Sequence, residues 1–212
     1  MSRIKNILNS LFGKDHTAAW KQFAVEQNGS YVVGKGPHYD SVEIDYLNHK
    51  IIFDQYTYYQ VVGGKSYDTT YTRIRLEFRS RDDLQFRITE QNWIDLIGKI
   101  FGLQDIRVGD REFDRRFLIK GNDELKVQSL FSGHIIRNLF LAQEKVHLQV
   151  LKGEGVYDEP IGEGNSLLYY LSETLVKDVK QLNSLLNLYK EVIDRLTKGE
   201  SISSVPDKQL RS

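Results

Sequence analysis

The 212-residue chain has no cysteine and no net charge. Without cysteine there can be no disulfide, thiolate nucleophile, cysteine zinc site or iron–sulfur cluster. The 29 Lys and Arg residues are balanced by 29 Asp and Glu, so the broad basic surface typical of nucleic-acid-binding proteins is not expected. No apolar run approaches the ~18 residues of a membrane-spanning helix. A hydrophobic content of 40% still predicts a folded globular protein.

The absence of cysteine also agrees with a reducing compartment. The apolar residues near the amino terminus are separated by polar ones at helical spacing, so they do not form the continuous apolar core of a signal peptide. We therefore expect a cytoplasmic protein.

The length predicts one domain, and we place it at residues 1–199, with a disordered tail over 200–212. Residues 1–28 have helical periodicity, 30–90 are rich in strand patterns, and 91–199 are mixed and then helical. There is no internal repeat. The predicted fold class is α+β, with an antiparallel sheet of about six or seven strands, helices at the amino terminus and a long carboxy-terminal helix.

The strand predictions come from alternation of apolar and polar residues. Val42, Ile44 and Tyr46 alternate with Glu43 and Asp45. Similar patterns occur around residues 72–78, 84–88 and 146–151. Residues 51–62 are predicted as strand because they are dense in β-branched and aromatic residues, and a short strand is also expected over 117–120. Gly63-Gly64 marks a turn between two of these strands. Short connections between successive strands indicate antiparallel pairing, with one face buried and one in solvent.

Helical spacing predicts helices over residues 17–27 and 93–101, and a helical run over 125–139 that is broken at Gly133. The longest predicted helix spans 167–198, where no glycine or proline occurs. Such a helix would be about 45 Å long, so its apolar stripe needs cover along its length. Either the amino-terminal helices cover it, or a second copy of the chain pairs with it. In the second case we expect self-association to use Leu182, Leu186, Tyr189 and Ile193.

A group of arginines is the strongest candidate for ligand binding. Arg73 and Arg75 share one side of a predicted strand, and Arg87 lies on a strand expected to be its neighbour. Guanidinium groups bind carboxylates and phosphates through forked hydrogen bonds, and Tyr58 or Tyr71 would lie beside them. The alternative, which we favour, is a solvent-exposed face whose arginines pair with Glu43, Asp45 or Glu77 across strands.

The remaining motifs indicate no catalytic or metal site. The five histidines lack the spacing of metal ligands, and no nucleophile-elbow pattern surrounds Ser132 near His134. The glycine pairs complete neither a dinucleotide fingerprint nor a P-loop. Acids and arginines alternate over residues 105–116, which favours a salt-bridged connection over a cation site. We expect no cofactor, and an enzyme is the less favoured interpretation.

Residues 1–13 form a short amphipathic segment flanked by Arg3, Lys5 and Lys14. Such a segment can lie on a membrane surface. Its packing on the protein's own sheet is the more economical interpretation, because only three cations accompany it.

The sequence Phe113-Asp114-Arg115-Arg116-Phe117, followed by Gly121-Asn122-Asp123-Glu124, resembles a group of uncharacterised bacterial proteins known only as domains of unknown function. The resemblance covers the carboxy-terminal half of the chain. It implies a bacterial origin, and a short strand followed by an aspartate-started helix, a second helix, a strand and a long closing helix. It implies no reaction, because that group has no assigned activity.

These observations favour a non-catalytic intracellular binding or assembly module that self-associates through its carboxy-terminal helix. The alternative is a small protein or enzyme that binds an anionic ligand on the arginine-rich face of its sheet.

Overall fold

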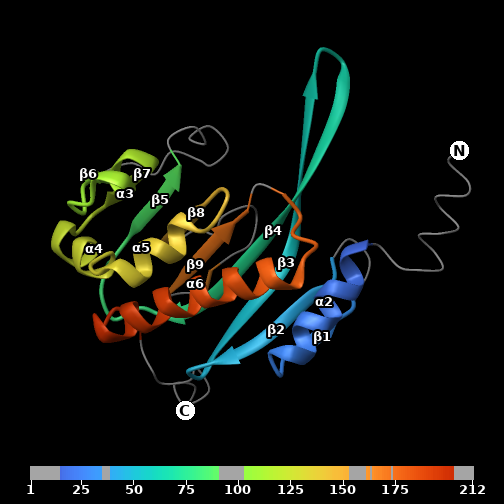
Figure 1. Cartoon of the computed structure of the whole chain (residues 1–212), viewed down its shortest axis with the longest axis horizontal. Helices are drawn as coiled ribbons and strands as arrows, with labels where there is room; N and C mark the ends of the chain where they lie inside the picture. Colours follow the sequence, from blue (N-terminus) through green and yellow to red (C-terminus); the bar gives the residue numbers. More distant parts are fainter. Residues whose placement is uncertain are drawn as a thin grey trace, which may run out of the picture.

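A computed structural model of the chain describes residues 15–34, 39–90, 103–152, 161–162, 164–172 and 174–202. It contains one antiparallel sheet with helices packed over it (Figure 1). The predicted α+β class is therefore confirmed, but the sheet has nine strands and not six or seven. Two predicted features, the amphipathic segment over 1–13 and the helix over 93–101, lie outside the described residues.

The strands pair in the order β1-β2-β3-β4-β9-β8-β5-β7-β6. Every pairing is antiparallel. The strands are β1 (Ser30–Val32), β2 (Ser41–Tyr46), β3 (His49–Val62), β4 (Lys65–Arg79), β5 (Phe86–Glu90), β6 (Gln104–Ile106), β7 (Phe117–Gly121), β8 (His147–Lys152) and β9 (Asn165–Leu171). The last two strands in the sequence, β8 and β9, thus lie between β4 and β5.

The predicted long helix over 167–198 was wrong in its first part, because β9 occupies residues 165–171. Residues 165–171 form a strand, and the closing helix α6 (Val179–Lys198) has 20 residues. At 1.5 Å per residue it is about 30 Å long and not 45 Å. The error has a physical cause: all seven residues of β9 are buried, so the strand shows no alternation of apolar and polar positions. Leu168, Leu171 and Leu175 then happen to lie at helical spacing.

Four other helices are described: α2 (Asp15–Glu26), α3 (Arg111–Arg116), α4 (Glu124–Leu130) and α5 (His134–Leu141). Aspartate side chains cap three helices, since Asp110, Asp123 and Asp178 accept backbone N–H groups at the starts of α3, α4 and α6. Gly133, with φ +80°, separates α4 from α5 as predicted. No helix among the described residues is long and apolar enough to span a bilayer.

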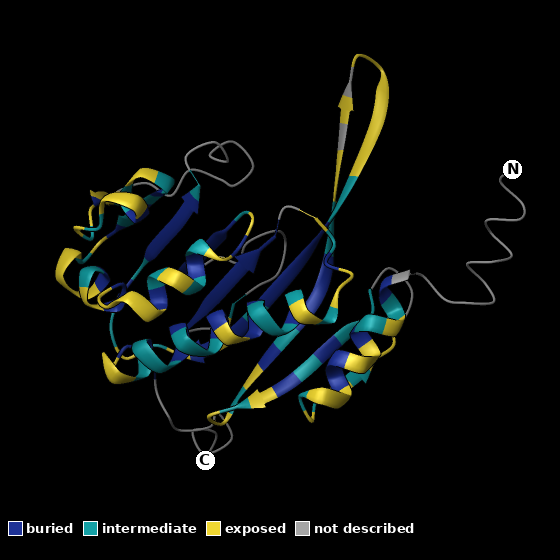
Figure 2. Ribbon diagram, in the orientation of Figure 1, coloured by how far each residue is buried: buried dark blue, intermediate teal, exposed yellow. Residues whose placement is uncertain are grey.

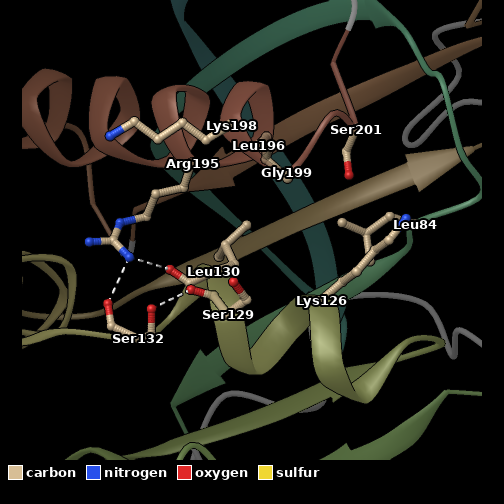
Figure 3. Close-up of a pocket in the computed structure, with 10 residues that line it drawn as sticks. All are labelled: Leu84, Lys126, Ser129, Leu130, Ser132, Arg195, Leu196, Lys198, Gly199 and Ser201. Carbon is tan, nitrogen blue, oxygen red and sulfur yellow. Dashed lines mark hydrogen bonds between the residues drawn. The ribbon is translucent and has the colours of Figure 1, made fainter.

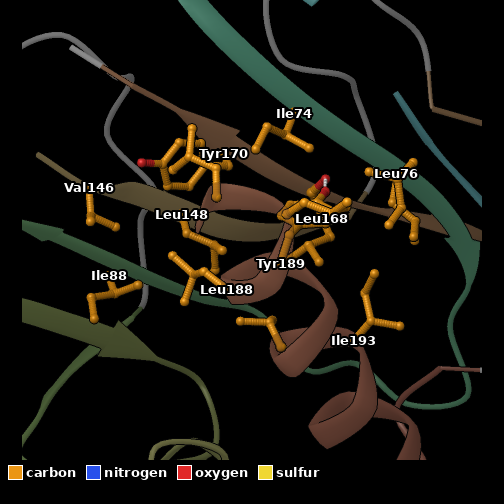
Figure 4. Close-up of a cluster of buried hydrophobic side chains, with 14 of the residues drawn as sticks. Ile74, Leu76, Ile88, Val146, Leu148, Leu168, Tyr170, Leu188, Tyr189 and Ile193 are labelled. Atoms are coloured by element: carbon orange, nitrogen blue, oxygen red, sulfur yellow. Dashed lines mark hydrogen bonds between the residues drawn. The ribbon is translucent and has the colours of Figure 1, made fainter. Parts of the chain in front are cut away.

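The helix α6 packs on the sheet of its own chain (Figure 4). Leu182, Leu186, Tyr189 and Ile193, predicted for self-association, are at most 1% exposed. The Tyr189 hydroxyl donates a hydrogen bond to the carbonyl oxygen of Leu168 at 2.5 Å. These four side chains belong to the core of one chain, so they cannot form an exposed interface. Of the two predicted alternatives, cover from within the chain is the one observed, and α2 contributes to it.

Two residues that were predicted to belong to a disordered tail, Ser201 and Ile202, are packed against the domain. Ser201 and Ile202 are 3% and 1% exposed, and Ile202 forms a β-bridge with Ser80. The Ser201 hydroxyl donates to the carboxylate of Asp82 at 2.7 Å. The chain therefore returns to the body of the domain after α6, and the rest of the predicted tail lies outside the described residues.

A long hairpin projects from the sheet (Figure 1). The partners of β3 on β2 end at Phe53, and those of β4 on β9 begin at Arg73, yet β3 and β4 stay paired out to Val62 and Lys65. Gly63 and Gly64, with φ +59° and +77°, close it in the two-residue turn that the sequence predicts. We call residues 57–70 the hairpin arm. Its surface is mostly exposed, unlike that of the sheet (Figure 2).

Candidate functional site

The arginines predicted to bind a ligand lie on the sheet face opposite α6. Along β4, Ile74, Leu76 and Phe78 belong to the main core beneath the helices. The alternate residues of β4, which include Arg73 and Arg75, therefore point to the other face, which we call the arginine face. This face has its own small apolar cluster of Tyr71, Leu151, Leu167, Tyr169 and Leu171.

Arg73 and Arg75 both bind the carboxylate of Asp54. Nε and Nη2 of Arg73 donate to the two oxygens of Asp54 at 2.7 and 2.8 Å, and Nη2 of Arg75 donates to the same group at 2.5 Å. Asp54 lies on β3 directly opposite Arg73. The predicted partners were Glu43, Asp45 and Glu77, so the expected pairing occurs but with a different acid.

Asp54 affects the pKa values of its two partners. Burial lowers the pKa of Arg75, and the charge of Asp54 opposes this only in part. For Arg73 burial also acts to lower the pKa, but hydrogen bonding and charge from Asp54 outweigh it and the pKa is raised. The two guanidinium groups thus share the carboxylate of Asp54 on a partly buried surface.

Tyrosines extend the arginine face onto the hairpin arm. Tyr56 and Tyr71 are opposite each other on β3 and β4, and their rings stack with centroids 6.5 Å apart. The Arg73 guanidinium lies 5.8 Å from the centroid of the Tyr56 ring. Tyr58 is two residues further along β3 and thus on the same side. The structure therefore brings the predicted residues Tyr58, Tyr71, Arg73 and Arg75 onto one continuous face.

Arg87 is on the arginine face but not beside the other two arginines. It pairs in register with Gln149, which pairs with Tyr169, which pairs with Arg75. Three strand spacings of ~4.8 Å separate β5 from β4, or about 14 Å. The predicted neighbourhood of these two strands was wrong, because β8 and β9 intervene. One ligand held by all three arginines would have to reach across four strands.

His147, on β8, is a buried polar residue that the sequence did not single out. It is 1% exposed, and burial together with the charge of Arg87 lowers its pKa to about 3, although its side-chain interaction with Gln149 opposes this. The imidazole is therefore neutral near pH 7 and cannot act there as a general acid. Among the described residues, no three His, Cys, Asp or Glu side chains are placed to hold a metal ion.

Asp54 was not predicted as the partner of Arg73 and Arg75 because of its place on β3. It lies in an otherwise uncharged apolar and aromatic run of β3, and its side of the strand was not assigned. The two-residue turn at Gly63-Gly64 contains the missing signal, because it fixes the register of the hairpin. Counting back from the turn pairs Asp54 with Arg73.

The acid- and arginine-rich segment over 105–116 is a salt-bridged connection, as predicted. Arg116 donates to Glu90 at 2.8 Å and to the carbonyl oxygen of Leu141 at 2.6 Å. Nε of Arg137 lies 3.1 Å from the carboxylate of Asp110. Nearby, Ser132 donates its hydroxyl to the Ser129 carbonyl oxygen at 2.7 Å, so it does not form a nucleophile pair with His134.

A pocket of about 300 Å³ lies where α4 meets the end of α6 (Figure 3). Two of its cations, Arg195 and Lys126, have structural contacts. Nη1 of Arg195 donates to the carbonyl oxygens of Leu130 and Ser132 at 3.1 and 2.7 Å, which caps the end of α4. Lys126 donates to Asp82 at 2.6 Å. These contacts give Arg195 and Lys126 a structural role at the pocket.

Comparisons with known proteins give the fold but no family. No family model matches the chain, and no curated protein matches it. One solved structure that is similar is the crystal structure of the mycobacterial trehalose monomycolate transport factor A, TtfA, with a TM-score of 0.53 and 8% sequence identity. The match covers 90% of this chain and 97% of that one. The resemblance to uncharacterised bacterial proteins stays a prediction, and the similarity that is shown is one of fold.

Proposed function

We propose that this chain is a non-catalytic binding module that contacts a macromolecular partner through its hairpin arm. The observation that carries the proposal is the exposure of large side chains on an element that leaves the sheet. Tyr59 and Val61 are each 71% exposed, and Tyr67 is 49% exposed. Aromatic side chains of this kind are enriched at the centres of protein interfaces.

The chemistry of the sheet supports a binding role over a catalytic one. The arginines nearest the arm are engaged by Asp54, and His147 is neutral because of its low pKa. The similar protein TtfA is described as a transport factor, which agrees with a role other than catalysis. We propose that the module acts in the cytoplasm, in keeping with its lack of cysteine.

A second candidate is the binding of a small anion on the arginine face. It is favoured by the gathering of Arg73 and Arg75 on one face of the sheet, with Tyr58 and Tyr71 on the same side. Isothermal titration with inorganic phosphate and with succinate tests it. The candidate requires saturable binding that Arg75→Gln weakens at least about tenfold. Equal heats for the two proteins would exclude it.

Site-specific crosslinking in cells of the source organism tests the main proposal. A photoreactive phenylalanine analogue replaces Tyr59 in the full chain, and the control replaces Leu125, which is 79% exposed on α4. The proposal predicts a discrete covalent adduct from position 59 and none from position 125. The same pattern of adducts from both positions, or no adduct from either, would contradict it.

A further inference from the structure

Among the described residues, no strand pairs with the outer edge of β3 in the hairpin arm. The strand β2 pairs with β3 only as far as Phe53. The Tyr39 hydroxyl donates to Oγ1 of Thr57 at 2.7 Å, and the side chains of Tyr39 and Tyr59 are also hydrogen-bonded, so side-chain contact with the rest of the chain reaches Tyr59. The backbone from Tyr58 to Val62, however, pairs with no described strand on this edge. Backbone N–H and C=O groups on this edge can therefore pair with an added strand.

This edge has none of the features that normally protect a free edge. Residues 55–62 read Gln-Tyr-Thr-Tyr-Tyr-Gln-Val-Val, without a charge, a proline or a glycine. Natural edge strands usually carry lysine, proline or a bulge that prevents edge-to-edge pairing. The other strand of the arm, β4, does carry charges at Lys65 and Asp68. The two edges of the arm therefore differ in charge, and only the β4 edge carries a feature that opposes pairing.

Resting on the proposed function, we propose that the occupant of this edge is the hairpin arm of a second copy. The two β3 strands pair antiparallel about a twofold axis near Tyr59, which gives a four-stranded sheet in the order β4-β3-β3-β4. An uncharged edge meets its own copy without like charges facing each other. The charged residues Lys65 and Asp68 stay on the two outer strands.

This arrangement accounts for the exposed side chains. In an antiparallel pair centred on Tyr59, Thr57 of one copy faces Val61 of the other, so Tyr59 and Val61 of both copies gather on the same side. A two-stranded ribbon is marginally stable alone, whereas three or more strands support one another. The arm extends away from the body of the domain, so a second arm can approach its edge (Figure 2).

Sedimentation analysis of the full chain tests the pairing. We expect a dimer of twice the 24.6 kDa chain mass. Val61→Lys places a charge on the β3 edge and is expected to weaken the dimer at least about tenfold. The matched control is Ser66→Lys, because Ser66 faces Val61 in register but lies on β4. This control should dimerise like the wild type. Circular dichroism and thermal unfolding establish that each variant is folded.

Three outcomes would overturn the pairing. They are a wild-type monomer at all concentrations up to about 100 μM, equal effects of Val61→Lys and Ser66→Lys, and a dimer that survives replacement of residues 58–69 by Asn-Gly. The crosslinking result keeps the two proposals apart. An adduct of Tyr59 with a different protein, from a monomeric chain, excludes the second copy but supports the binding module. No adduct contradicts both.

Discussion

Asp54 compensates the charge of two partly buried arginines, and its removal has a predictable cost. Its side chain is 8% exposed, while those of Arg73 and Arg75 are 10% and 20% exposed. Removing one partner of a buried ion pair leaves an uncompensated charge in a poorly solvated place. We expect Asp54→Asn to lower the free energy of unfolding by about 3 kcal/mol in urea titrations.

The matched control for Asp54 is Glu43→Gln on the neighbouring strand β2. It removes the ion pair with Lys50, whose side chain is 53% exposed, and should cost less than about 1 kcal/mol. Similar losses in the two variants would mean that Asp54 is not the organising charge of the arginine face.

His147 makes stability depend on pH in a defined direction. Its pKa falls from 6.5 to about 3 on folding, so between these values the unfolded chain binds a proton that the folded chain does not. Stability is unaffected above about pH 6.5 and falls by about 1.4 kcal/mol per pH unit below it. Between pH 6.5 and pH 5, the unfolding free energy of the wild type should therefore fall by about 2 kcal/mol relative to that of His147→Gln.

Urea titrations at several pH values measure this difference. His134→Gln serves as the comparison, because it makes the same substitution at an exposed position at the start of α5. A His147→Gln curve parallel to that of the wild type would show that the imidazole titrates in the folded protein.

At the level of elements, α6 acts as a core helix, and its variants should behave accordingly. Leu186 lies on the buried side of α6 and is 1% exposed. We expect Leu186→Ala to lower the unfolding free energy by about 3 kcal/mol through the cavity it leaves. Asn187→Ala, at the next and exposed position, should change it by no more than about 0.5 kcal/mol. Urea titration distinguishes this from an interface helix, where Leu186→Ala would change assembly and leave stability unaltered.

The hairpin arm should be separable from the domain. The described side chains of residues 58–69, which leave out Gln60 and Val62, belong to neither apolar cluster, and the Thr57–Thr70 pair can be closed by a two-residue Asn-Gly turn. We expect this deletion to change the unfolding free energy by less than about 1 kcal/mol and to leave one cooperative transition. Loss of cooperativity in urea would show that the arm is part of the core.

How well an element could be predicted depended on where it lies in the sheet. The strands β2 and β4 have distinct faces, and their alternation was enough to place them. The strand β9, buried on both faces, has no such pattern and was predicted as helix. For the candidate site, alternation placed Arg73, Arg75 and Tyr71 on one face, whereas the partner Asp54 required the register.

At the level of the whole molecule, the order of the strands in the sheet could not be predicted from the sequence. Nothing in the local pattern of β4 or β5 shows that two strands from far along the chain separate them. The distance between Arg75 and Arg87 follows from that order alone. Contacts of this kind depend on pairing preferences between remote segments, which one sequence does not display.

The central position of β8 and β9 also determines when the protein can be completed during synthesis. The segments β1–β4 and β5–β7 are made first, but in the described part of the sheet β8 and β9 join them, and β9 ends at Leu171. Until the ribosome has passed that point, the nascent chain has two incomplete sheets with open inner edges on β4 and β5. Such non-local closure slows folding and exposes the edges to mispairing. The two halves of this domain thus become one fold only near the end of translation.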